Sequence, residues 1–332
     1  MNTSNAAAAG PALRVLSRQD LSRLSYRLQD VLDAVEGAYR AFASGASANP
    51  PKLSVKPQDG RSIAYAMLGR DGERETVAVK TSYKFGHEGA KADERYYTTL
   101  LLHDDRQGAP IALMDGSLVG SLRTPAATAL IARACARSDA RTALVVGSGV
   151  QGQTALPFLV EALPQLQRLI VHGHHGAGID AVLTRMQEHH PDRQVEVSRD
   201  LRRSAEAADI IIGAAGPSSP ESVQAGWLRP GSLAILVGYG IDKKALHDAD
   251  YRVATSAEQM KVTGQDLALD GRLPALDAEL PCILSGLQKG RRSGSDRVFA
   301  YNSGMVLTDI ALGRVLAEQA IAQGLGQEVA LW

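Results

Sequence analysis

The sequence predicts an α/β protein that combines a doubly wound parallel sheet with a second unit of the α+β class. From Arg141 onward, short apolar runs alternate with helical segments, which is typical of parallel strands covered by helices on both faces. Between Pro50 and Met114, period-2 runs separated by turn residues favour an antiparallel sheet. The chain has 332 residues, and at about 100–200 residues per domain this length fits two such units.

The composition excludes some classes of partner. The 36 Lys and Arg residues balance 36 Asp and Glu residues, so the chain lacks the basic excess of a surface that binds nucleic-acid phosphates. No apolar run approaches the roughly 18 residues of a membrane-spanning helix, and Met1–Gly10 is too short and uncharged for a signal peptide. Cys135 and Cys282 lie far apart, without the spacing of a zinc site. We therefore expect a cytoplasmic protein with reduced cysteines and with neither nucleic acid nor membrane as a partner.

The elements of the N-terminal part follow from the spacing of apolar residues. Residues Leu16–Phe42 have apolar positions at helical spacing and Ser17 as a candidate N-cap, which predicts one helix. The antiparallel strands are expected at Ser62–Met67, Thr76–Lys80 and Thr98–Leu102, with loops at Gly86–Asp93 and Asp104–Gly108. An Ala-rich helix is expected from Arg123 to Ala136, with Pro125 at an early position where the missing N–H needs no partner.

The alternating block after Arg141 is expected to form the parallel sheet. Its strands are predicted at Ala143–Val146, Leu169–Val171, Val195–Val197, Ile210–Ile212 and Leu233–Val237. The Gly, Ser and Arg content of Lys289–Asp296 indicates a loop. A last helical pattern, Val306–Gln323, follows this block, and we expect that helix to pack back on the N-terminal part.

A glycine pattern at the start of this block predicts dinucleotide binding. The run Ala143-Leu-Val-Val-Gly147-Ser-Gly149-Val-Gln-Gly152 contains G-x-G-x-x-G between a strand and a helix, the context that the motif requires. Gly147 would form the tight turn, Gly149 would let the backbone approach the pyrophosphate, and Gly152 would let helix and strand pack closely. The phosphates would then lie at the positive N-terminus of the helix. We therefore expect a Rossmann-type sheet and a nicotinamide dinucleotide cofactor.

The residues after the second strand bear on which dinucleotide binds. An acidic residue that binds the ribose is expected about 20 residues after the fingerprint, but the chain reads Val171-His172-Gly173-His174-His175 there and has no carboxylate before Asp180. Without an acid to repel a 2′-phosphate, NADP is slightly favoured over NAD, with His174, His175 or Arg185 as its contacts. A solvated loop is the alternative role of these histidines. The predicted cofactor-binding residues are Thr124, Gly147, Gly149, Val150, Gln151, Gly152, His172, His174 and Gly238.

The same histidines do not predict a metal site. Adjacent histidines without a nearby pair of carboxylates seldom complete a coordination shell. We therefore expect no bound metal ion.

The chain carries four motifs, namely Asp104–Gly116 (DDRQGAPIALMDG), Leu122–Thr128 (LRTPAAT), Gly147–Gly152 and Asn302–Asp309 (NSGMVLTD). In this order, and across nearly the full length, they resemble the motifs of the ornithine cyclodeaminase/mu-crystallin family. Family members include cyclodeaminases, alanine and other amino-acid dehydrogenases, ketimine or cyclic-imine reductases, and enzymes that build amino-acid conjugates. The resemblance implies a Rossmann domain, 126–303, and a split substrate-binding domain, 1–125 and 304–332, that forms a homodimer through its sheet. The active site would lie between the two domains.

The resemblance also assigns substrate-binding residues. Arg123 matches the family arginine that holds the substrate α-carboxylate, Lys80 matches its active-site lysine, and Lys52 lies where many members have a further carboxylate-binding arginine. Met67 matches the active-site methionine. Cations that converge beside a nicotinamide can hold an amino or imino acid by its carboxylate, and arginine does so bidentately. The alternatives are a surface ion pair for Arg123, a solubilising strand-edge lysine for Lys80 and an exposed loop cation for Lys52.

Two positions depart from the cyclodeaminase pattern. Gly240 stands where a cyclodeaminase has its catalytic aspartate, and Asp242 could replace that residue only if the loop is shifted. Tyr65 stands where a carboxylate precedes the family's methionine. Deamination with ring closure needs a base for the protons of the substrate amine and of water, so the loss of both carboxylates argues against it.

The sequence therefore predicts an NAD(P)-dependent oxidoreductase that acts on the C–N bond of an α-amino or α-imino acid, with ketimine or cyclic-imine reduction as the best match. Hydride would pass between the nicotinamide and the substrate α-carbon, and Lys80 or Tyr65 would supply the proton. The predicted catalytic residues are Lys80, Arg123, Tyr65 and Asp242. Two alternatives stay open. One is a cyclodeaminase-like or conjugate-forming enzyme that uses NAD, and the other is a non-catalytic protein that binds NADPH and a small ligand.

Overall fold

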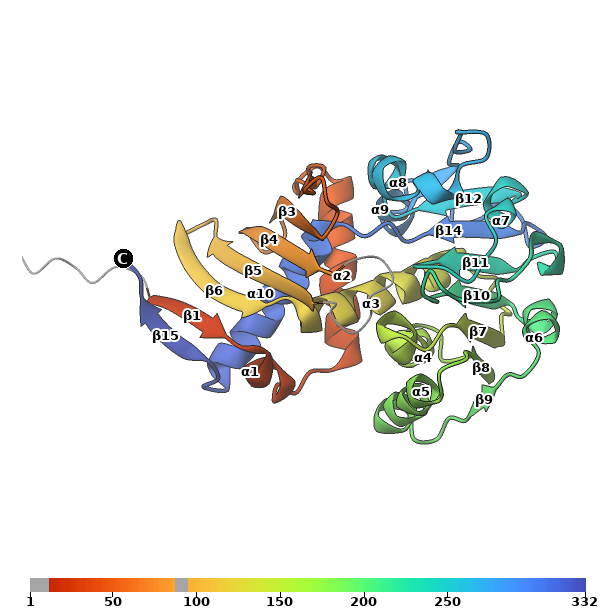
Figure 1. Cartoon of the computed structure of the whole chain (residues 1–332), viewed down its shortest axis with the longest axis horizontal. Helices are drawn as coiled ribbons and strands as arrows, with labels where there is room; N and C mark the ends of the chain where they lie inside the picture. Colours follow the sequence, from red (N-terminus) through yellow and green to blue (C-terminus); the bar gives the residue numbers. More distant parts are fainter. Residues whose placement is uncertain (1–11, 87–94) are drawn as a thin grey trace, which may run out of the picture.

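The structure, a computed structural model, describes residues 12–86 and 95–332. Two sheets lie side by side along the long axis of the molecule, with helices packed between and around them (Figure 1). The expectations for the first ten residues, and for residues 87–93 of the loop at Gly86–Asp93, fall outside the described residues. Within the described part no helix is both long enough and apolar enough to cross a membrane.

The first sheet has seven strands in the order β15-β1-β6-β5-β4-β3-β2. They are β1 (Ala12–Leu16), β2 (Leu53–Val55), β3 (Ser62–Asp71), β4 (Thr76–Phe85), β5 (Arg95–Asp104), β6 (Ala109–Asp115) and β15 (Gln327–Ala330). Neighbouring strands pair antiparallel except β1 and β6, which pair parallel. The helices of this part are α1 (Arg18–Ser22), α2 (Leu28–Ala43), α3 (Ser117–Cys135) and α10 (Val306–Ala322). The three predicted antiparallel strands are confirmed, and each is longer than expected because the ladder continues toward the turns.

The second sheet has eight parallel strands in the order β13-β12-β14-β11-β10-β7-β8-β9. They are β7 (Thr142–Val146), β8 (Arg168–His172), β9 (Val195–Val197), β10 (Ile210–Gly213), β11 (Leu233–Leu236), β12 (Tyr251–Ala254), β13 (Ala278–Glu279) and β14 (Val298–Tyr301). Its helices are α4 (Val150–Ala162), α5 (Gly176–His189), α6 (Leu201–Ala207), α7 (Lys244–His247), α8 (Ala257–Thr263) and α9 (Leu280–Leu284), with 3₁₀ turns η1 (Ala225–Trp227) and η2 (Gln265–Leu267). The strand order reverses between β7 and β10, so the predicted doubly wound parallel sheet is confirmed.

The single helix predicted over Leu16–Phe42 is wrong. Leu16 ends a strand, α1 has only five residues, and a non-helical segment of five residues separates it from α2. Buried Leu21, Leu24 and Leu28 continue the helical spacing across this break, so the pattern could not reveal it. Ser17 is nevertheless the predicted N-cap, since its hydroxyl accepts from the backbone N–H of Asp20 in a capping box.

The helix predicted from Arg123 begins earlier, at Ser117, so Pro125 lies inside α3 and not near its start. A proline there leaves the carbonyl four residues before it without a helical donor. That carbonyl belongs to Ser121, and the hydroxyl of Thr154 on α4 donates to it at 3.3 Å. A contact from a neighbouring helix therefore compensates for a proline that the sequence pattern places at a helix start.

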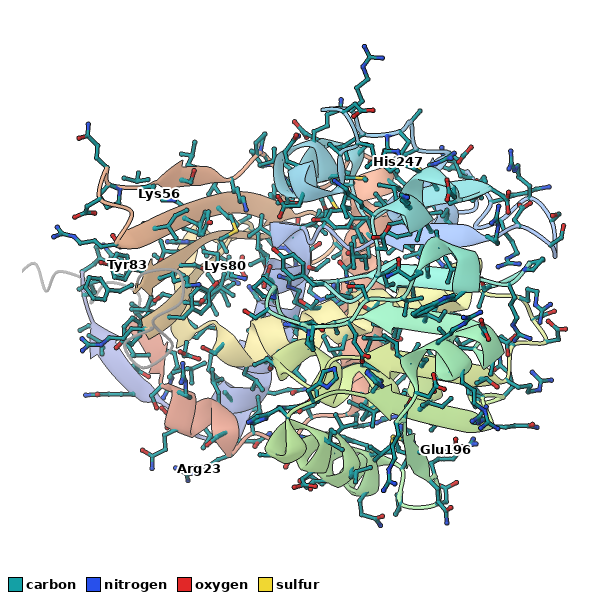
Figure 2. The ribbon with its side chains drawn as sticks, turned by 45° about the vertical axis from the view of Figure 1, so that its right-hand side comes forward. Arg23, Lys56, Lys80, Tyr83, Glu196 and His247 are labelled. Carbon is teal, nitrogen blue, oxygen red and sulfur yellow. The ribbon has the colours of Figure 1, made fainter. Side chains whose placement is uncertain are left out.

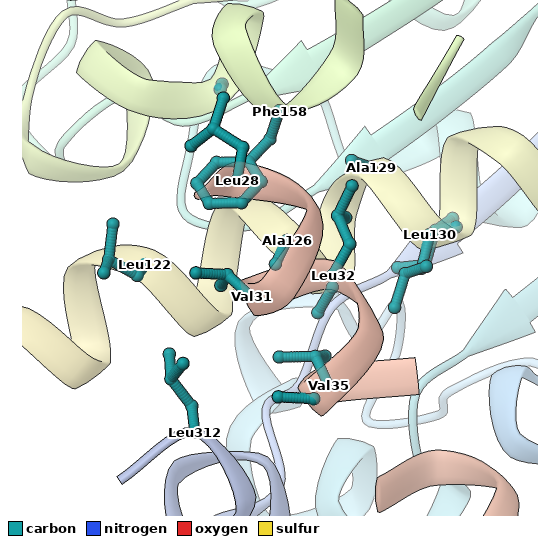
Figure 3. Packing of buried hydrophobic residues seen from close by; sticks show 14 of the residues in the cluster. Leu28, Val31, Leu32, Val35, Leu122, Ala126, Ala129, Leu130, Phe158 and Leu312 are labelled. Atoms are coloured by element: carbon teal, nitrogen blue, oxygen red, sulfur yellow. The ribbon is translucent and has the colours of Figure 1, made fainter. Parts of the chain in front are cut away.

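One core joins the two parts of the molecule. Figure 3 shows buried side chains of α2, α3, α4 and α10 packed together: Leu28, Val31, Leu32 and Val35 with Leu122, Ala126, Ala129 and Leu130, with Phe158 and with Leu312. The last helix packs on β3, β4 and β5, as expected. Its Gly313 leaves room for Leu100, which a Cβ would overlap. The domain boundaries stay a prediction, and the one at residue 125 falls within α3.

The register of the first sheet determines which side chains share a face. We call the face that carries Leu100 and contacts α10 the inner face, and the opposite one the outer face. Lys80 is the cross-strand partner of Leu100 and of Met67, and Ser82 is the cross-strand partner of Tyr65. These residues therefore all belong to the inner face.

Candidate active site

Two of the predicted cations meet at one buried carboxylate. Lys80 donates from Nζ to Oδ1 of Asp309 at 2.7 Å, and Arg123 on α3 donates from Nε to the same oxygen at 3.2 Å. Asp309 lies in the first turn of α10, and its side chain is 2% exposed. In Figure 2, Tyr83 lies near the left edge of the molecule, and Lys80 of the same strand lies nearer its centre. Lys80 and Arg123 thus come together through a residue to which the sequence analysis gave no role, and we call these three residues the ion cluster.

The two cations keep Asp309 ionised. Burial raises the pKa of Asp309, but the charges and hydrogen bonds of Arg123 and Lys80 outweigh it and hold the pKa below 3.8. Of the Arg123 nitrogens, only Nε has a partner within the described residues. Gly304, with φ of +70°, lets the guanidinium approach the backbone, since a Cβ there would lie 2.9 Å from Nη1. The two Nη atoms are therefore available to a ligand.

A small pocket lies beside the ion cluster and is lined from both sides. Lys52, Met67 and Arg123 line it from the first part of the molecule, and Gln259 and Thr263 line it from α8. Its volume is 150 Å³, below the roughly 300–1,000 Å³ of pockets for drug-sized ligands. The predicted substrate residues Lys52, Met67 and Arg123 therefore share one pocket that suits a small molecule.

Lys52 is half-buried in this pocket. Its Nζ lies 4.7 Å from the centroid of the Tyr65 ring, within the range of a cation–π contact. Burial lowers the pKa of Lys52, and the charge of Tyr96 acts in the opposite direction. Tyr65 thus contacts Lys52 and shares the inner face with Lys80.

Tyr96 is a further ionisable group near the cations. It lies on β5, two residues before Thr98 on the inner face. Burial raises the pKa of Tyr96, but hydrogen bonds with Ser82 and Thr98 and the charges of Lys80 and Arg123 outweigh it, so the net pKa is lowered from 10.0. The phenol is therefore more acidic than an ordinary tyrosine.

The glycine fingerprint has the geometry that its motif predicts. Gly147 directly follows β7 and has a φ of +108°, and a Cβ there would lie 2.5 Å from the backbone nitrogen of Ala215. A Cβ on Gly152 would overlap the carbonyl oxygen of Gly147, whereas one on Gly149 would meet no atom within 4 Å. Helix α4 begins directly after Gly149, and no side chain in the described part caps it. Open space at an uncapped helix N-terminus fits a pyrophosphate.

A larger pocket of 840 Å³ lies over the fingerprint. It is lined by residues 146–149, 172–175 and 215–220, by Tyr239 and, from the first sheet, by Lys84. Four of the predicted cofactor residues, Gly147, Gly149, His172 and His174, therefore line one pocket. Because Lys84 belongs to β4, this pocket also lies between the two parts of the molecule.

The other predicted cofactor residues lie around this pocket or away from it. Val150 is 65% exposed at the start of α4, and Oε1 of Gln151 is buried without a partner in the described part. Gly238 is exposed beside Tyr239. Thr124 is buried in α3, where its carbonyl accepts from Nδ2 of Asn302 at 3.1 Å, and it does not line the pocket.

His172, the last residue of β8, and His174, just after it, have an acidic partner that the sequence does not reveal. Oε2 of Glu221, in the loop after β10, lies 2.9 Å from Nε2 of His172 and 3.3 Å from Nε2 of His174. The possible ligand atoms of these three residues lie within 4.8 Å of one another. The expectation that no metal binds assumed no nearby pair of carboxylates, and the structure places one carboxylate, that of Glu221, beside these histidines.

The two other candidate contacts for a 2′-phosphate have different partners. Nδ1 of His175 accepts from the backbone N–H of Gly178 at 3.1 Å and so caps α5. Arg185 donates to Glu188 at 2.8 Å, and it does not line the larger pocket. The structure therefore does not bring Arg185 together with His174.

Asp242 lies apart from the ion cluster. Its Oδ1 accepts from the backbone N–H of Lys244 at 2.8 Å, at the start of α7, and it lines neither of the two pockets. Gly240 has φ of +101°, and a Cβ there would lie 3.0 Å from Cγ1 of Val146. The loop is thus built for glycine at position 240, and Asp242 does not face Lys80 and Arg123.

Sequence reasoning missed Asp309, Tyr96, Gln259 and Glu221. Asp309 has a local signal, because it is the one carboxylate among the apolar positions of the first turns of its helix, and a buried charge requires a partner. The other three have no such signal. Tyr96 comes near the cations through the pairing of β5 with β4, and Glu221 comes near the histidines through the long loop after β10. Neither position follows from local spacing.

Comparisons with known proteins cover nearly the whole chain. Among curated relatives, nodulation efficiency protein NfeD of Rhizobium meliloti is 25% identical over 320 residues, which is 95% of this chain and 97% of the relative. Delta(1)-pyrroline-2-carboxylate reductase of Bacillus cereus is 24% identical over 315 residues, 91% of this chain and 95% of the relative. N-((2S)-2-amino-2-carboxyethyl)-L-glutamate dehydrogenase of Staphylococcus aureus is 24% identical over 331 residues, 96% of this chain and 98% of the relative.

Solved structures share the fold. Delta(1)-pyrroline-2-carboxylate reductase of Thermococcus litoralis, in complex with NADH and L-proline, has a TM-score of 0.81 at 24% identity, covering 96% of this chain and all of that one. The iminosuccinate reductase of Paracoccus denitrificans, in complex with NAD⁺, has a TM-score of 0.79 at 18% identity, covering 96% and 99%. The model of the ornithine cyclodeaminase/mu-crystallin family matches residues 14–324. The chain therefore belongs to the ornithine cyclodeaminase/mu-crystallin family, and the sequence-based recognition is confirmed.

Proposed function

We propose that this protein reduces an imine that carries an α-carboxylate, using a nicotinamide dinucleotide. The observation that carries the proposal is the ion cluster at the edge of a 150 Å³ pocket that residues of both parts of the molecule line. The relatives named as reductases of imines or dehydrogenases of amino acids support it. Cyclic imines are the best candidates within this class, because the pocket is small.

Arg123 and Lys80 act on the substrate carboxylate in this proposal. The ion cluster has one positive charge in excess, since Lys80 and Arg123 share a single carboxylate. The two free Nη atoms of Arg123 can donate to both oxygens of a ligand carboxylate in parallel. Lys52 and Met67 then line the rest of the small pocket. A substrate held in this way has one orientation relative to the larger pocket.

The dinucleotide, when bound, supplies the hydride that adds to the imine carbon. The residues that would hold it are those of the fingerprint, Gly147, Gly149 and Gly152, with the N-terminus of α4 for the pyrophosphate. His172 and His174 line the pocket at the end of β8, where an adenosine ribose would lie. NAD and NADP both fit this scheme, and the slight preference for NADP stays a prediction.

The nitrogen of the imine needs a proton as the carbon accepts hydride. Lys80 and Tyr65 are the sequence-based candidates, and both lie on the inner face. Tyr96 joins them, because hydrogen bonds with Ser82 and Thr98, together with the charges of Lys80 and Arg123, lower the pKa of its phenol. A phenol of lowered pKa is a stronger acid at neutral pH than an ordinary tyrosine. We infer that one of these inner-face groups delivers the proton.

A cyclodeaminase reaction is less well supported, because residue 240 is a glycine and the Asp242 carboxylate accepts from the backbone N–H of Lys244. The test is an assay of NADH and NADPH oxidation with a cyclic imine that has an α-carboxylate and with the same ring lacking it. We expect turnover only with the first. Ornithine should release no ammonia, in the wild type or in Asp242→Asn. Ammonia release that depends on Asp242, without net nucleotide oxidation, would refute the reductase.

We propose that the protein acts as a homodimer through the outer face of the first sheet. Six large apolar side chains on β2, β3, β4 and β5 are exposed there, namely Leu53, Val55, Leu68, Tyr83, Phe85 and Tyr97. An apolar patch of this kind on a soluble protein marks an interaction site. One structural neighbour, an archaeal alanine dehydrogenase, is described as a dimer with bound NAD.

A further inference from the structure

The carboxylate of Glu221 lies at the end of β8, the second strand of the parallel sheet in chain order, where the residues next in the sequence are not acidic. In Rossmann folds a carboxylate after this strand accepts from the ribose hydroxyls of the adenosine. Here β8 ends at His172, and the next three residues carry no carboxylate. The Glu221 carboxylate reaches the same place from the loop after β10, at 2.9 Å from His172 and 3.3 Å from His174. A residue 49 positions away thus supplies the missing charge.

The loop that carries Glu221 is anchored at both ends. The backbone N–H of Ala214 donates to the carbonyl of Val146 at 2.8 Å, and that of Val223 donates to the carbonyl of Gly240 at 3.0 Å. Val223 is fully buried, two residues after Glu221. Between the anchors, the hydroxyl of Ser219 donates to the carbonyl of Glu221 at 3.0 Å. The carboxylate therefore has a defined position relative to the fingerprint.

The carboxylate can still reach a ligand. The side chains of Glu221 and His174 are 50% and 51% exposed, whereas that of His172 is 7% exposed. Within the described residues only Oε2 of Glu221 has side-chain partners, so Oε1 can accept from vicinal ribose hydroxyls. A 2′-phosphate in the same place would instead meet a charge of its own sign.

We propose that Glu221, positioned by His172 and His174, binds the adenosine ribose and selects NAD(H) over NADP(H). This assignment rests on the proposed function and reverses the slight sequence-based preference for NADP. A metal ion is the other ligand that two imidazoles and one carboxylate can hold. The nucleotide is favoured because His172 and His174 line the same pocket as Gly147 and Gly149.

The test measures affinity for NADH and for NADPH by fluorescence titration of the purified chain without substrate. The wild type should bind NADH about tenfold or more tightly than NADPH, because like charges that face each other strongly disfavour a complex. Glu221→Gln keeps the shape and removes the charge, so the ratio should fall toward one, mainly through tighter binding of NADPH. Glu206→Gln is the matched control. Its carboxylate is 47% exposed and paired with Arg202 on α6, a helix of which no residue lines the larger pocket, and the variant should leave the ratio unchanged.

Three results would overturn the assignment. The first is a wild type that binds NADPH as tightly as NADH. The second is a preference for NADH that Glu221→Gln does not alter. The third is purified protein that holds one zinc per chain through this cluster, with a nucleotide ratio insensitive to Glu221→Gln. In all three the imine reductase can still be active, whereas failure to bind either nucleotide would refute the proposed function as well.

Discussion

Asp309 determines how Arg123 meets a ligand. Its Oδ1 accepts from Nε, which fixes the guanidinium plane while both Nη atoms remain available. The same oxygen accepts from Lys80, so the two cations share one partner and cannot separate without leaving a buried charge unpaired. Substrate recognition and local stability are therefore tied to one carboxylate.

Replacing Arg123 by alanine should remove substrate use and leave nucleotide binding intact. Loss of one partner of a buried, hydrogen-bonded charge pair costs about 2–5 kcal/mol, so kcat/KM should fall at least about thirtyfold. Steady-state kinetics and nucleotide titration check the two halves of this expectation. Arg133→Ala, on the same helix but paired with Glu36, is the control and should keep normal kinetics. Unchanged kcat/KM in Arg123→Ala would show that this arginine does not hold the substrate.

Asp309→Asn should destabilise the protein by about 3–5 kcal/mol at pH 7, because it leaves the buried Lys80 and the partly buried Arg123 without a counter-charge. The folded protein holds the pKa of Asp309 below 3.8, so its contribution is present above that pH and is lost as the pH falls through the folded pKa. The difference in unfolding free energy between wild type and Asp309→Asn should therefore be constant at neutral pH and shrink below about pH 4. Urea unfolding from pH 7 to pH 3 measures it. A difference that grows in acid would contradict this account.

At the scale of elements, the turn between β7 and α4 contains a residue, Gly149, whose substitution should affect dinucleotide binding and not folding. Gly149 has φ of −78° and open space around its Cβ position, so a valine there is compatible with the folded chain. The side chain would fill the space that a pyrophosphate needs. Gly149→Val should therefore weaken dinucleotide binding by at least about tenfold while thermal unfolding stays close to that of the wild type.

The matched control for this variant is Gly226→Val, which adds the same side chain at another glycine with open space, in η1 and away from the fingerprint. It should retain nucleotide affinity. Tight binding by folded Gly149→Val would show that the loop is only a structural turn.

Local patterns predicted the elements whose signal is local. The fully buried strands Ile210–Gly213 and Leu233–Leu236 are apolar runs next to turns, and the fingerprint is contiguous. Strands β12 and β14, each of four residues, were not predicted, and in β12 the charged Arg252 interrupts the apolar run. Local patterns do not show contacts between residues that lie far apart in the sequence, so the predicted sites lacked some of their residues. Asp309 lies 229 residues from Lys80, and Glu221 lies 49 residues from His172.

At the scale of the whole molecule, the outer face of the first sheet should mediate dimerisation. Leu68→Asp combined with Tyr97→Asp introduces two charges on a surface whose apolar side chains are exposed in the single chain. Burying these charges in an interface without partners is costly, so the variant should be a monomer. Light scattering after gel filtration measures the mass. Leu287→Asp, at a residue that is 69% exposed outside this sheet, should remain a dimer, and a monomeric wild type would contradict the proposal.

The pairing of β1 with β15 places Ala12 opposite Ala330 and so joins the two ends of the described chain. During synthesis β1 to β6 leave the ribosome before any strand of the parallel sheet, and α10 leaves it only after the last of those strands. At synthesis rates of about 5–20 residues per second, Leu100 and its neighbours wait roughly 10–40 s for the helix that buries them. The strands of the parallel sheet are complete by then. The inner face of the first sheet is therefore covered by α10 only after the strands of the parallel sheet have been synthesised. During that interval its apolar side chains are accessible to chaperones and prone to aggregation.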